Sequence, residues 1–150
     1  MSTIKRELYN HCFTMLQSRI ASAREAMEQA QEAANSEDKS SAGDKYETSR
    51  AMGHIDKEMH ARRLAQALEE MSFLEKINID KPYSKITSGA LVKTDKANFF
   101  IAISSGQIMA QGEKYIAISP SAPIAAAMMG KQSQDTFAFM NQFYTILYIE

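Results

Sequence analysis

The feature that constrains this sequence most is a stretch from residue 3 to residue 35 that contains neither Gly nor Pro. Proline breaks a helix and glycine weakens one, so their absence favours a single long helix. Apolar residues recur in this stretch at alternating steps of three and four: Phe13, Leu16, Ile20, Ala23, Met27, Ala30 and Ala34. This heptad spacing predicts a helix that packs against another helix along one seam.

A second Pro-free stretch, residues 46–77, predicts the partner helix. Its apolar residues are Met52, Ile55, Met59, Leu64, Ala67, Leu68, Met71 and Leu74. The step of five from Met59 to Leu64 breaks the heptad, so we expect the seam to drift or the helix to unwind locally around Arg62.

Between the two predicted helices, the polar residues 36–43 fit a reversal of the chain. Residues 1–78 therefore form an antiparallel helical hairpin with an acidic tip at residues 36–47. At about 1.5 Å of rise per residue, helices of about 30 residues span about 45 Å. A hairpin of this length fits either an arm that reaches into a partner or a dimerisation element.

The second half of the chain has a different composition. Residues 1–80 hold 25 of the 35 charged side chains, whereas residues 81–150 hold nine of the 13 aromatic ones. Short apolar or alternating runs then replace the helical period, which predicts strands. These runs are Ala90–Val92, Phe99–Ile103, Tyr115–Ile118, Phe137–Phe139 and Phe143–Ile149, with turns at 94–98 and 111–114. We therefore expect an α+β protein in which residues 79–150 form a small antiparallel sheet.

One short helix interrupts these strands at residues 121–130. Ser121 is a favourable cap, Pro123 suits a first turn, and Gly130 can end the helix in a left-handed conformation. The prediction is one short helix across the sheet.

Charge and motifs exclude several classes of function. The net charge is −1 and the pI about 6.3, so the chain lacks the cationic field that holds bare DNA or an anionic membrane. No run approaches the roughly 18 apolar residues of a membrane span. A lone cysteine, Cys12, fits a reducing compartment, and we expect a cytoplasmic protein. Phosphate-binding glycine loops, dinucleotide fingerprints and the nucleophile elbow are also absent from the sequence, which argues against a self-contained enzyme.

The sharpest chemical candidate is the acidic pair Asp44 and Glu47. Carboxylates at positions i and i+3 share one helix face and can approach one hard cation. The same spacing suits a capping box, in which Asp44 caps the second helix and Glu47 completes the cap. Both interpretations stay open, and they can coexist if Asp44 turns outward when a partner supplies the cation.

Both halves of the chain together resemble the bacterial Gre transcript-cleavage factors, which join a coiled-coil hairpin to a C-terminal FKBP-like domain. The tip pattern Gly43-Asp44-x-x-Glu47 lies where that family carries its two functional acids. More specific is the segment from Ile118 to Lys131, followed by Asp135, which is similar to the family's I-S-x-x-S-P-I-A-x-A-L-I-G-K-x-x-G-D segment.

The resemblance implies a function. The FKBP-like domain would dock on RNA polymerase through Ser119, Pro120, Ser121, Pro123 and Ile124, while the hairpin enters the secondary channel. Asp44 and Glu47 would then help to hold a catalytic Mg²⁺ in the polymerase active site, so that a backtracked transcript is cleaved at its 3′ end. The chain would be an accessory factor with no stably bound cofactor.

Two tip residues, Lys45 and Arg50, either contact RNA phosphate in that complex or lie as solvated charges on the helix.

Two rival hypotheses remain. Thr48, Ser49 and Arg50 follow Glu47 where the family carries an Asn-rich segment, which favours a polymerase-binding regulator that occupies the channel without stimulating cleavage. A prolyl isomerase is the other hypothesis, because the FKBP-like fold hosts that activity elsewhere. The chain has no Trp to floor a proline pocket, and fold alone does not confer function.

Overall fold

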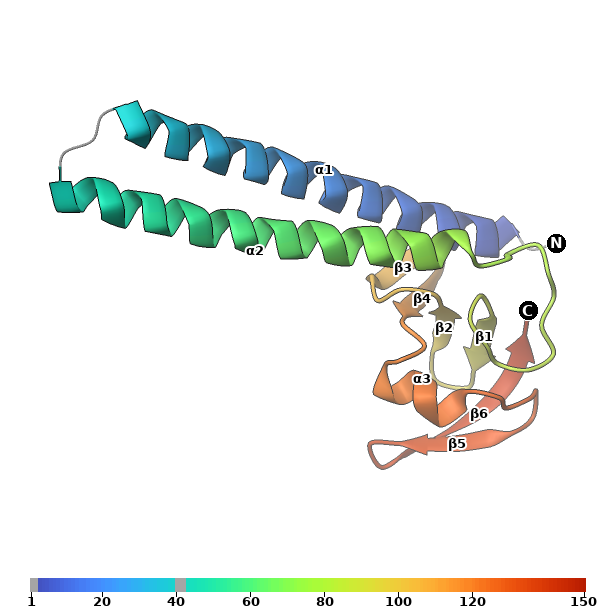
Figure 1. The fold of residues 1–150 in the computed structure, drawn as a ribbon. Helices are drawn as coiled ribbons and strands as arrows, with labels where there is room; N and C mark the ends of the chain where they lie inside the picture. The colour runs from blue at the N-terminus through green and yellow to red at the C-terminus, as the bar shows by residue number, and fades with distance from the viewer. Residues whose placement is uncertain (1–2, 40–42) are drawn as a thin grey trace. The chain divides into compact units, whose positions relative to one another are not determined.

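The computed structural model describes residues 3–39 and 43–150 and leaves out the side chains of residues 34, 36–39, 43–47, 49 and 50. Two long helices precede six strands and one short helix (Figure 1). In chain order these are α1 (Thr3–Lys39), α2 (Gly43–Glu75), β1 (Leu91–Thr94), β2 (Asn98–Ile101), β3 (Gly106–Ala110), β4 (Glu113–Ile118), α3 (Pro123–Met128), β5 (Thr136–Phe139) and β6 (Gln142–Ile149). The predicted α+β class, a helical hairpin followed by a β-rich part with one short helix, is confirmed.

Packing divides the chain into two compact units. The first, called here the sheet unit, combines residues 3–15 with residues 72–150, and the second, called the arm, comprises residues 16–71. The beginning of α1 and the end of α2 thus pack with the sheet. The domain boundary predicted after residue 78 stays a prediction.

The sheet is mixed, with strand order β3-β4-β2-β1-β6-β5. Four of its neighbouring pairs are antiparallel, but β2 and β4 run parallel, with Phe100 opposite Ala117. The prediction of a wholly antiparallel sheet is therefore wrong at this pair. The physical reason is the β3–β4 hairpin, which returns the chain so that β4 lies between β3 and β2.

Strand β3 was not predicted. Its sequence Gly-Gln-Ile-Met-Ala lacks an alternating apolar pattern, and only Ile108 and Ala110 of the strand are buried. It pairs with β4 alone at one edge of the sheet. The predicted turn at 111–114 does connect these two strands, since Gln111 and Gly112 both adopt positive φ.

Both faces of the sheet are buried over its central strands. Successive side chains of a strand point to opposite faces, so Val92 and Phe99 lie on one face and Leu91 and Phe100 on the other. The first face joins α3 in a core made of Ile86, Ala90, Val92, Phe99, Ile101, Ile118, Ala125, Met128, Phe137 and Ile146. The second face is closed by the helix segments of the same unit, as the fully buried Leu8 and Leu74 indicate.

The α1 seam is confirmed where the structure describes it. Leu16 and Ala23 are buried, and the other seam residues from Phe13 to Ala30 are half-buried. Two side-chain contacts join α1 to α2 beside this seam: Arg19 to Glu70, at 3.3 Å, and Lys57 to Gln31, at 2.6 Å.

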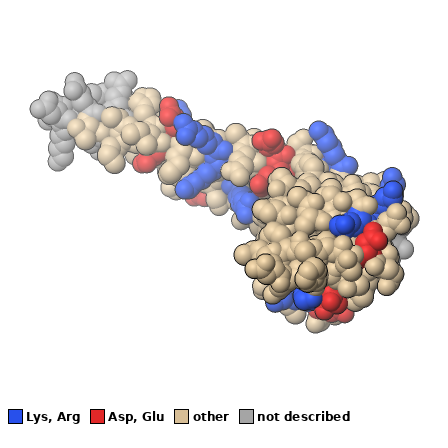
Figure 2. Space-filling model, turned by 90° about the horizontal axis from the view of Figure 1, so that it is seen from below, with Lys and Arg blue, Asp and Glu red and all other residues tan. Residues whose placement is uncertain are grey.

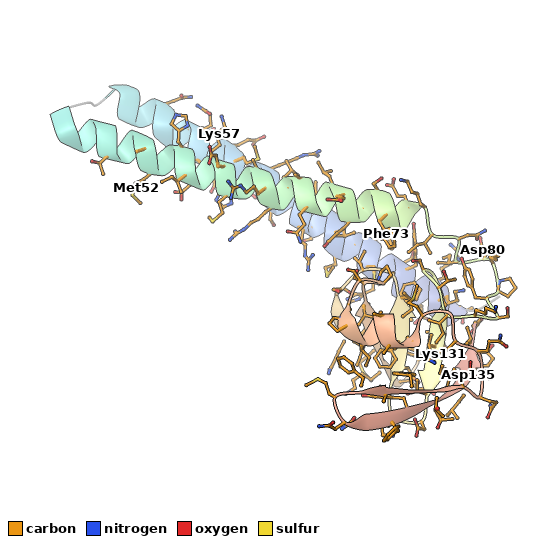
Figure 3. The ribbon with its side chains drawn as sticks, turned by 60° about the horizontal axis from the view of Figure 1, so that its bottom comes forward. Met52, Lys57, Phe73, Asp80, Lys131 and Asp135 are labelled. Atoms are coloured by element: carbon orange, nitrogen blue, oxygen red, sulfur yellow. The ribbon has the colours of Figure 1, made fainter. Side chains whose placement is uncertain are left out.

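The predicted seam of α2 is wrong in its first half and at Leu68, which is 41% exposed. Met52, Ile55 and Met59 are exposed, Ile55 by 65%, and Met52 points away from α1 (Figure 3). Helix α2 runs unbroken from Gly43 to Glu75, so no unwinding occurs around Arg62. A regular helix places residue i−4 beside Leu64, and that residue is the half-buried His60.

Candidate functional site

The predicted acidic tip lies at the start of α2. The backbones of Asp44 and Glu47 fall within the first two turns of the helix, which begins at Gly43. Their side chains, and those of Lys45 and Arg50, lie outside the described residues. The capping role, the metal-binding role and the RNA contact therefore all stay predictions. Among the described residues there is no group of three or more His, Cys, Asp or Glu side chains placed to hold a metal ion.

The predicted docking segment forms a tight turn between β4 and α3. The backbone N–H of Ala122 donates to the carbonyl of Ser119, at 3.0 Å. The hydroxyls of Ser119 and Ser121 lie 2.8 Å apart, and the Ser121 N–H donates to the Ser119 hydroxyl, at 3.2 Å. These contacts give the two serines one fixed arrangement at the surface.

The turn leads directly into α3, and here the predicted cap is wrong. Ala122, and not Ser121, is the N-cap residue, and its methyl side chain can form no cap bond. The Ser121 hydroxyl bonds to Ser119 instead. Pro123 lies in the first turn of the helix, as predicted. Gly130 follows the helix with φ of 79°, which confirms its left-handed conformation.

The five predicted docking residues are brought together, but they do not share one environment. Ser121 and Pro123 are exposed, whereas Ser119 and Pro120 are half-buried. Ile124 packs against the core under α3. The surface that a partner can contact is therefore the exposed serine and proline of this turn. Ile124 packs against the core and holds the turn in place.

Ser104 is a supporting residue that the sequence did not single out. Its hydroxyl accepts a hydrogen bond from the Ser119 N–H, at 3.1 Å, and so ties the loop after β2 to the docking turn. A serine in a loop carries no periodic signal, so only the fold reveals this contact.

The far end of the matched segment is also held by backbone bonds. Gly130 N–H donates to Ile86 O, at 2.8 Å, and Ile86 N–H donates to Lys131 O, at 2.9 Å. The Asp135 carboxylate accepts the N–H of Gln132, at 2.8 Å, and closes the turn before β5. Figure 3 shows Lys131 and Asp135 near each other beside this turn.

The beginning of α1 is anchored within the sheet unit. The buried Lys5 ammonium donates to Lys81 O and Glu150 O, each at 3.2 Å, and lies 4.8 Å from the centre of the Tyr83 ring. Burial lowers the pKa of Lys5, and the negative charges of Glu150 and Asp80 oppose that shift. The first turns of the long helix are therefore part of the packed unit and not a loose extension.

No described helix is long and apolar enough to cross a membrane. The sequence matches no protein-family model and no curated protein. Among solved structures, that of the transcription factor Gfh1 is similar to this chain, with 15% sequence identity and a TM-score of 0.36. The similarity covers 91% of this chain and 92% of that chain. The function of this chain therefore has to be argued from its own residues.

Proposed function

We propose that this protein is a bacterial cytoplasmic transcription elongation factor that binds RNA polymerase and stimulates Mg²⁺-dependent cleavage of backtracked transcripts. The hydrolysis belongs to the polymerase, and the chain acts as an accessory factor. Residues Ser119, Pro120, Ser121, Pro123 and Ile124 dock on the polymerase, and Asp44 and Glu47 act at the tip of a hairpin that enters the secondary channel. Transcript cleavage takes place at the RNA 3′ end within that complex.

The observation that carries this proposal most is the docking turn. Its sequence is the most specific part of the resemblance, and a turn that presents Ser121 and Pro123 to solvent is free to meet a partner. Side-chain and backbone bonds at Ser119 hold it in one conformation. A surface that is already ordered loses less conformational entropy on binding.

The length of the helices supports the second part of the proposal. Helix α1 has 37 residues and α2 has 33, which corresponds to about 55 Å and about 50 Å at about 1.5 Å per residue. The acidic pair lies at the first turns of α2, where the hairpin reverses. Helices of this length suit a hairpin that reaches into a channel.

Two carboxylates from an accessory protein fit the coordination chemistry of Mg²⁺. This ion prefers six oxygen ligands and commonly takes only one or two carboxylates from one contributor, with water and phosphate oxygens as the rest. When bound there, the ion would supply an activated water for hydrolysis of the transcript. Asp44 and Glu47 would therefore complete a site whose other ligands belong to the polymerase and the RNA.

The direct test uses stalled, backtracked elongation complexes of the cognate polymerase with Mg²⁺. We expect the protein to shorten the transcripts and the double variant Asp44→Ala/Glu47→Ala to lose about 100-fold of that rate, the upper range for losing a residue that supports a metal site. Binding of the double variant to polymerase should stay unchanged. Unchanged transcript length with saturating wild-type protein would rule out the cleavage function.

Docking is tested separately with a matched pair of variants. Ser121→Tyr places a bulky group on the docking turn, whereas Ser133→Tyr makes the same change at another exposed serine of the sheet unit. We expect only Ser121→Tyr to weaken polymerase binding, measured by titration of labelled protein. Equal weakening by both variants would contradict docking through this turn.

A polymerase-binding regulator without cleavage activity is the second candidate. It is favoured by Thr48, Ser49 and Arg50, which replace the Asn-rich segment of the resembling family. Such a protein would compete with an authentic cleavage factor and protect the transcript. The same backtracked complexes distinguish the two functions, because a competitor lowers cleavage by the added factor and shortens no RNA itself.

A further inference from the structure

The β5–β6 hairpin, residues 136–149, holds four of the five exposed large apolar side chains in the described part of the sheet unit. Charged residues make up 23% of the chain, yet these 14 residues include none. Four large apolar side chains of the hairpin are exposed: Met140 by 80%, Phe143 by 73%, Leu147 by 49% and Tyr148 by 48%. In Figure 2, the face of the sheet unit seen from below is mostly uncharged.

Composition alone does not explain this surface. Residues 97–112 and 115–130 are equally free of charged side chains. Together they expose only one large apolar residue, Met109. The hairpin therefore differs from these two segments because several of its large apolar side chains lie outside the core. Clustered exposed apolar side chains indicate an interaction surface.

The register of the hairpin separates an inner face from an outer face. Phe137 lies opposite Tyr144, and their rings stack at 4.8 Å within the core side of the sheet. The next pair, Ala138 opposite Phe143, points to the other side and is exposed. We call this side the outer face of the hairpin.

Strand β5 is also an open edge. It is the last strand in the sheet order and pairs with β6 only. Open edges pair readily with a strand of another chain, and proteins usually prevent this with Lys, Pro or a bulge. Residues 136–139, Thr-Phe-Ala-Phe, contain none of these.

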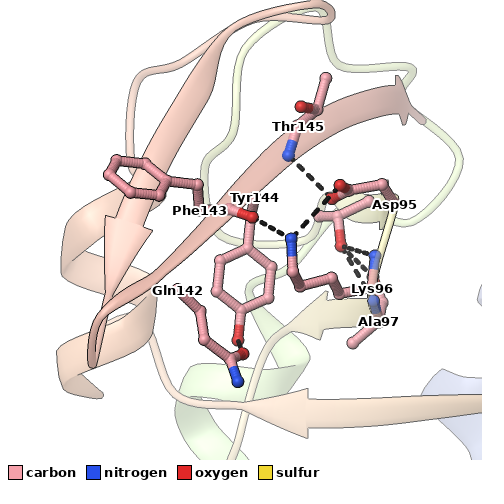
Figure 4. Close-up of polar contacts among 8 residues, drawn as sticks. Asp95, Lys96, Ala97, Gln142, Phe143, Tyr144 and Thr145 are labelled. Carbon is pink, nitrogen blue, oxygen red and sulfur yellow. Dashed lines mark hydrogen bonds and ion pairs between the residues drawn. The ribbon is translucent and has the colours of Figure 1, made fainter.

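Internal contacts hold the hairpin in place. Lys96 donates to the Phe143 carbonyl and lies 5.3 Å from the centre of the Tyr144 ring. The Asp95 carboxylate accepts the Thr145 N–H, at 2.9 Å (Figure 4). The two charged side chains of the β1–β2 turn that lie nearest to the hairpin therefore have hydrogen-bond partners within this chain. The outer face of the hairpin is held in place and carries no charged side chain.

We propose that a second copy of this chain docks on the β5–β6 hairpin, through a two-fold contact that pairs the β5 edges and brings Ala138, with Phe143 beside it, to the joined edge. A fitting occupant must bring an uncharged surface and a free strand edge, and the chain's own hairpin supplies both. A two-fold contact places the same patch on both partners, and here it brings no like charges together. Nucleic acid or a highly charged protein would find no ion pair on this surface.

The test measures self-association of the full chain by sedimentation equilibrium, with protein concentrations up to about 1 mM. We expect a monomer–dimer equilibrium in which Phe143→Ser raises the dimer dissociation constant about tenfold or more. The matched control is Met109→Ser, which removes a similarly exposed side chain, 68% exposed, from the opposite edge of the sheet. Both residues lie on the surface, so both variants should keep the wild-type melting temperature.

A charge-swap experiment locates the two-fold contact. Ala138→Lys and Ala138→Glu should each abolish association alone, because like charges meet across the pair, and a mixture of the two should restore it. A protein that stays monomeric, a loss with Met109→Ser equal to that with Phe143→Ser, or a loss with Ile55→Ser on the arm would each overturn the proposal. It would also be overturned if Phe143→Ser weakened polymerase binding and left self-association intact.

Discussion

The sheet unit and the arm are stabilised in different ways. Among the described residues, 25 apolar side chains are buried, and only Leu16, Ala23, Ala67 and Met71 of these belong to the arm. The sheet unit therefore rests on a packed core with contacts between distant parts of the sequence. The arm rests on one narrow seam and on bonds within each helix, so a substitution in it should have a smaller and more local effect.

Ion pairs do not compensate for the thin seam of the arm. Arg19 and Glu70 join the two helices at 3.3 Å, but their side chains are 48% and 28% exposed. Exposed pairs of this kind contribute about 0–1 kcal/mol. Helix propensity and the seam must therefore supply most of the arm's stability.

The largest expected difference is in core truncation. Phe100→Ala removes a fully buried ring from the sheet unit and should lower the free energy of unfolding by about 3–5 kcal/mol. Ile55→Ala removes an exposed arm side chain and should change it by less than about 0.5 kcal/mol. Urea denaturation followed by tyrosine fluorescence and by far-UV circular dichroism measures both. Equal losses would contradict the exposure of Ile55 on the arm.

The thiol of Cys12 provides a probe for the same difference. It is buried in the sheet unit, 3.6 Å from the Ser105 hydroxyl, and burial raises its pKa while the contact with Ser105 lowers it. Reaction with a thiol reagent should therefore require opening of the unit. Phe100→Ala should accelerate labelling by about 150- to 5,000-fold when the full loss of stability appears in that opening, and Ile55→Ala should not change it. Rapid labelling of the wild-type protein would contradict the packing of α1 against the sheet.

A backbone substitution next to the end of α2 gives a smaller effect. Gly89 has φ of 94°, and a Cβ added there would lie 2.8 Å from Ile77 Cγ2. Gly89→Ala should therefore cost about 1–3 kcal/mol through strain. Gly112→Ala is the matched control, with φ of 81° and no neighbour within 4 Å of the added Cβ. Thermal melts give the melting temperature of both variants. The cost of placing alanine at positive φ is common to both, so the extra loss in Gly89→Ala measures the close contact with Ile77.

Acid sensitivity should give the smallest effect. The Thr145 N–H, which donates to the Asp95 carboxylate, lowers the pKa of Asp95. A lowered pKa in the folded state adds stability that is present above the ordinary carboxyl pKa of about 3.9 and is lost as the pH falls through the folded value. Asp95→Asn should flatten the acid side of the stability curve below about pH 4. An unchanged acid side in Asp95→Asn would show that this bond does not persist in solution.

Local sequence patterns predicted the elements that repeat regularly. The two long helices, five of the six strands and the left-handed Gly130 follow from spacing, apolar runs and turn residues. The docking turn was located through the resemblance of the segment from Ile118 to Lys131 to a family segment, and not through spacing or composition. Its internal bonds were predicted incorrectly, since Ser121 bonds to Ser119 and leaves Ala122 as the cap.

Features that depend on distant contacts were not predicted. Strand β3 is an edge strand with little apolar content, and its pairing with β4 makes β2 and β4 parallel. The exposed hairpin around Phe143 was also invisible, because an apolar strand has the same sequence signal whether its outer face is covered or open.

The sequence by itself determined that this chain has two long helices before a small sheet, because helical and strand periods are local properties of neighbouring residues. Only the tertiary structure decided which face of α2 meets α1, since Leu64 and His60 define a seam that leaves Met52, Ile55 and Met59 in solvent. It also placed both helix ends with the sheet unit. The physical reason is that a period specifies where apolar residues recur, whereas burial depends on which partner surface lies opposite.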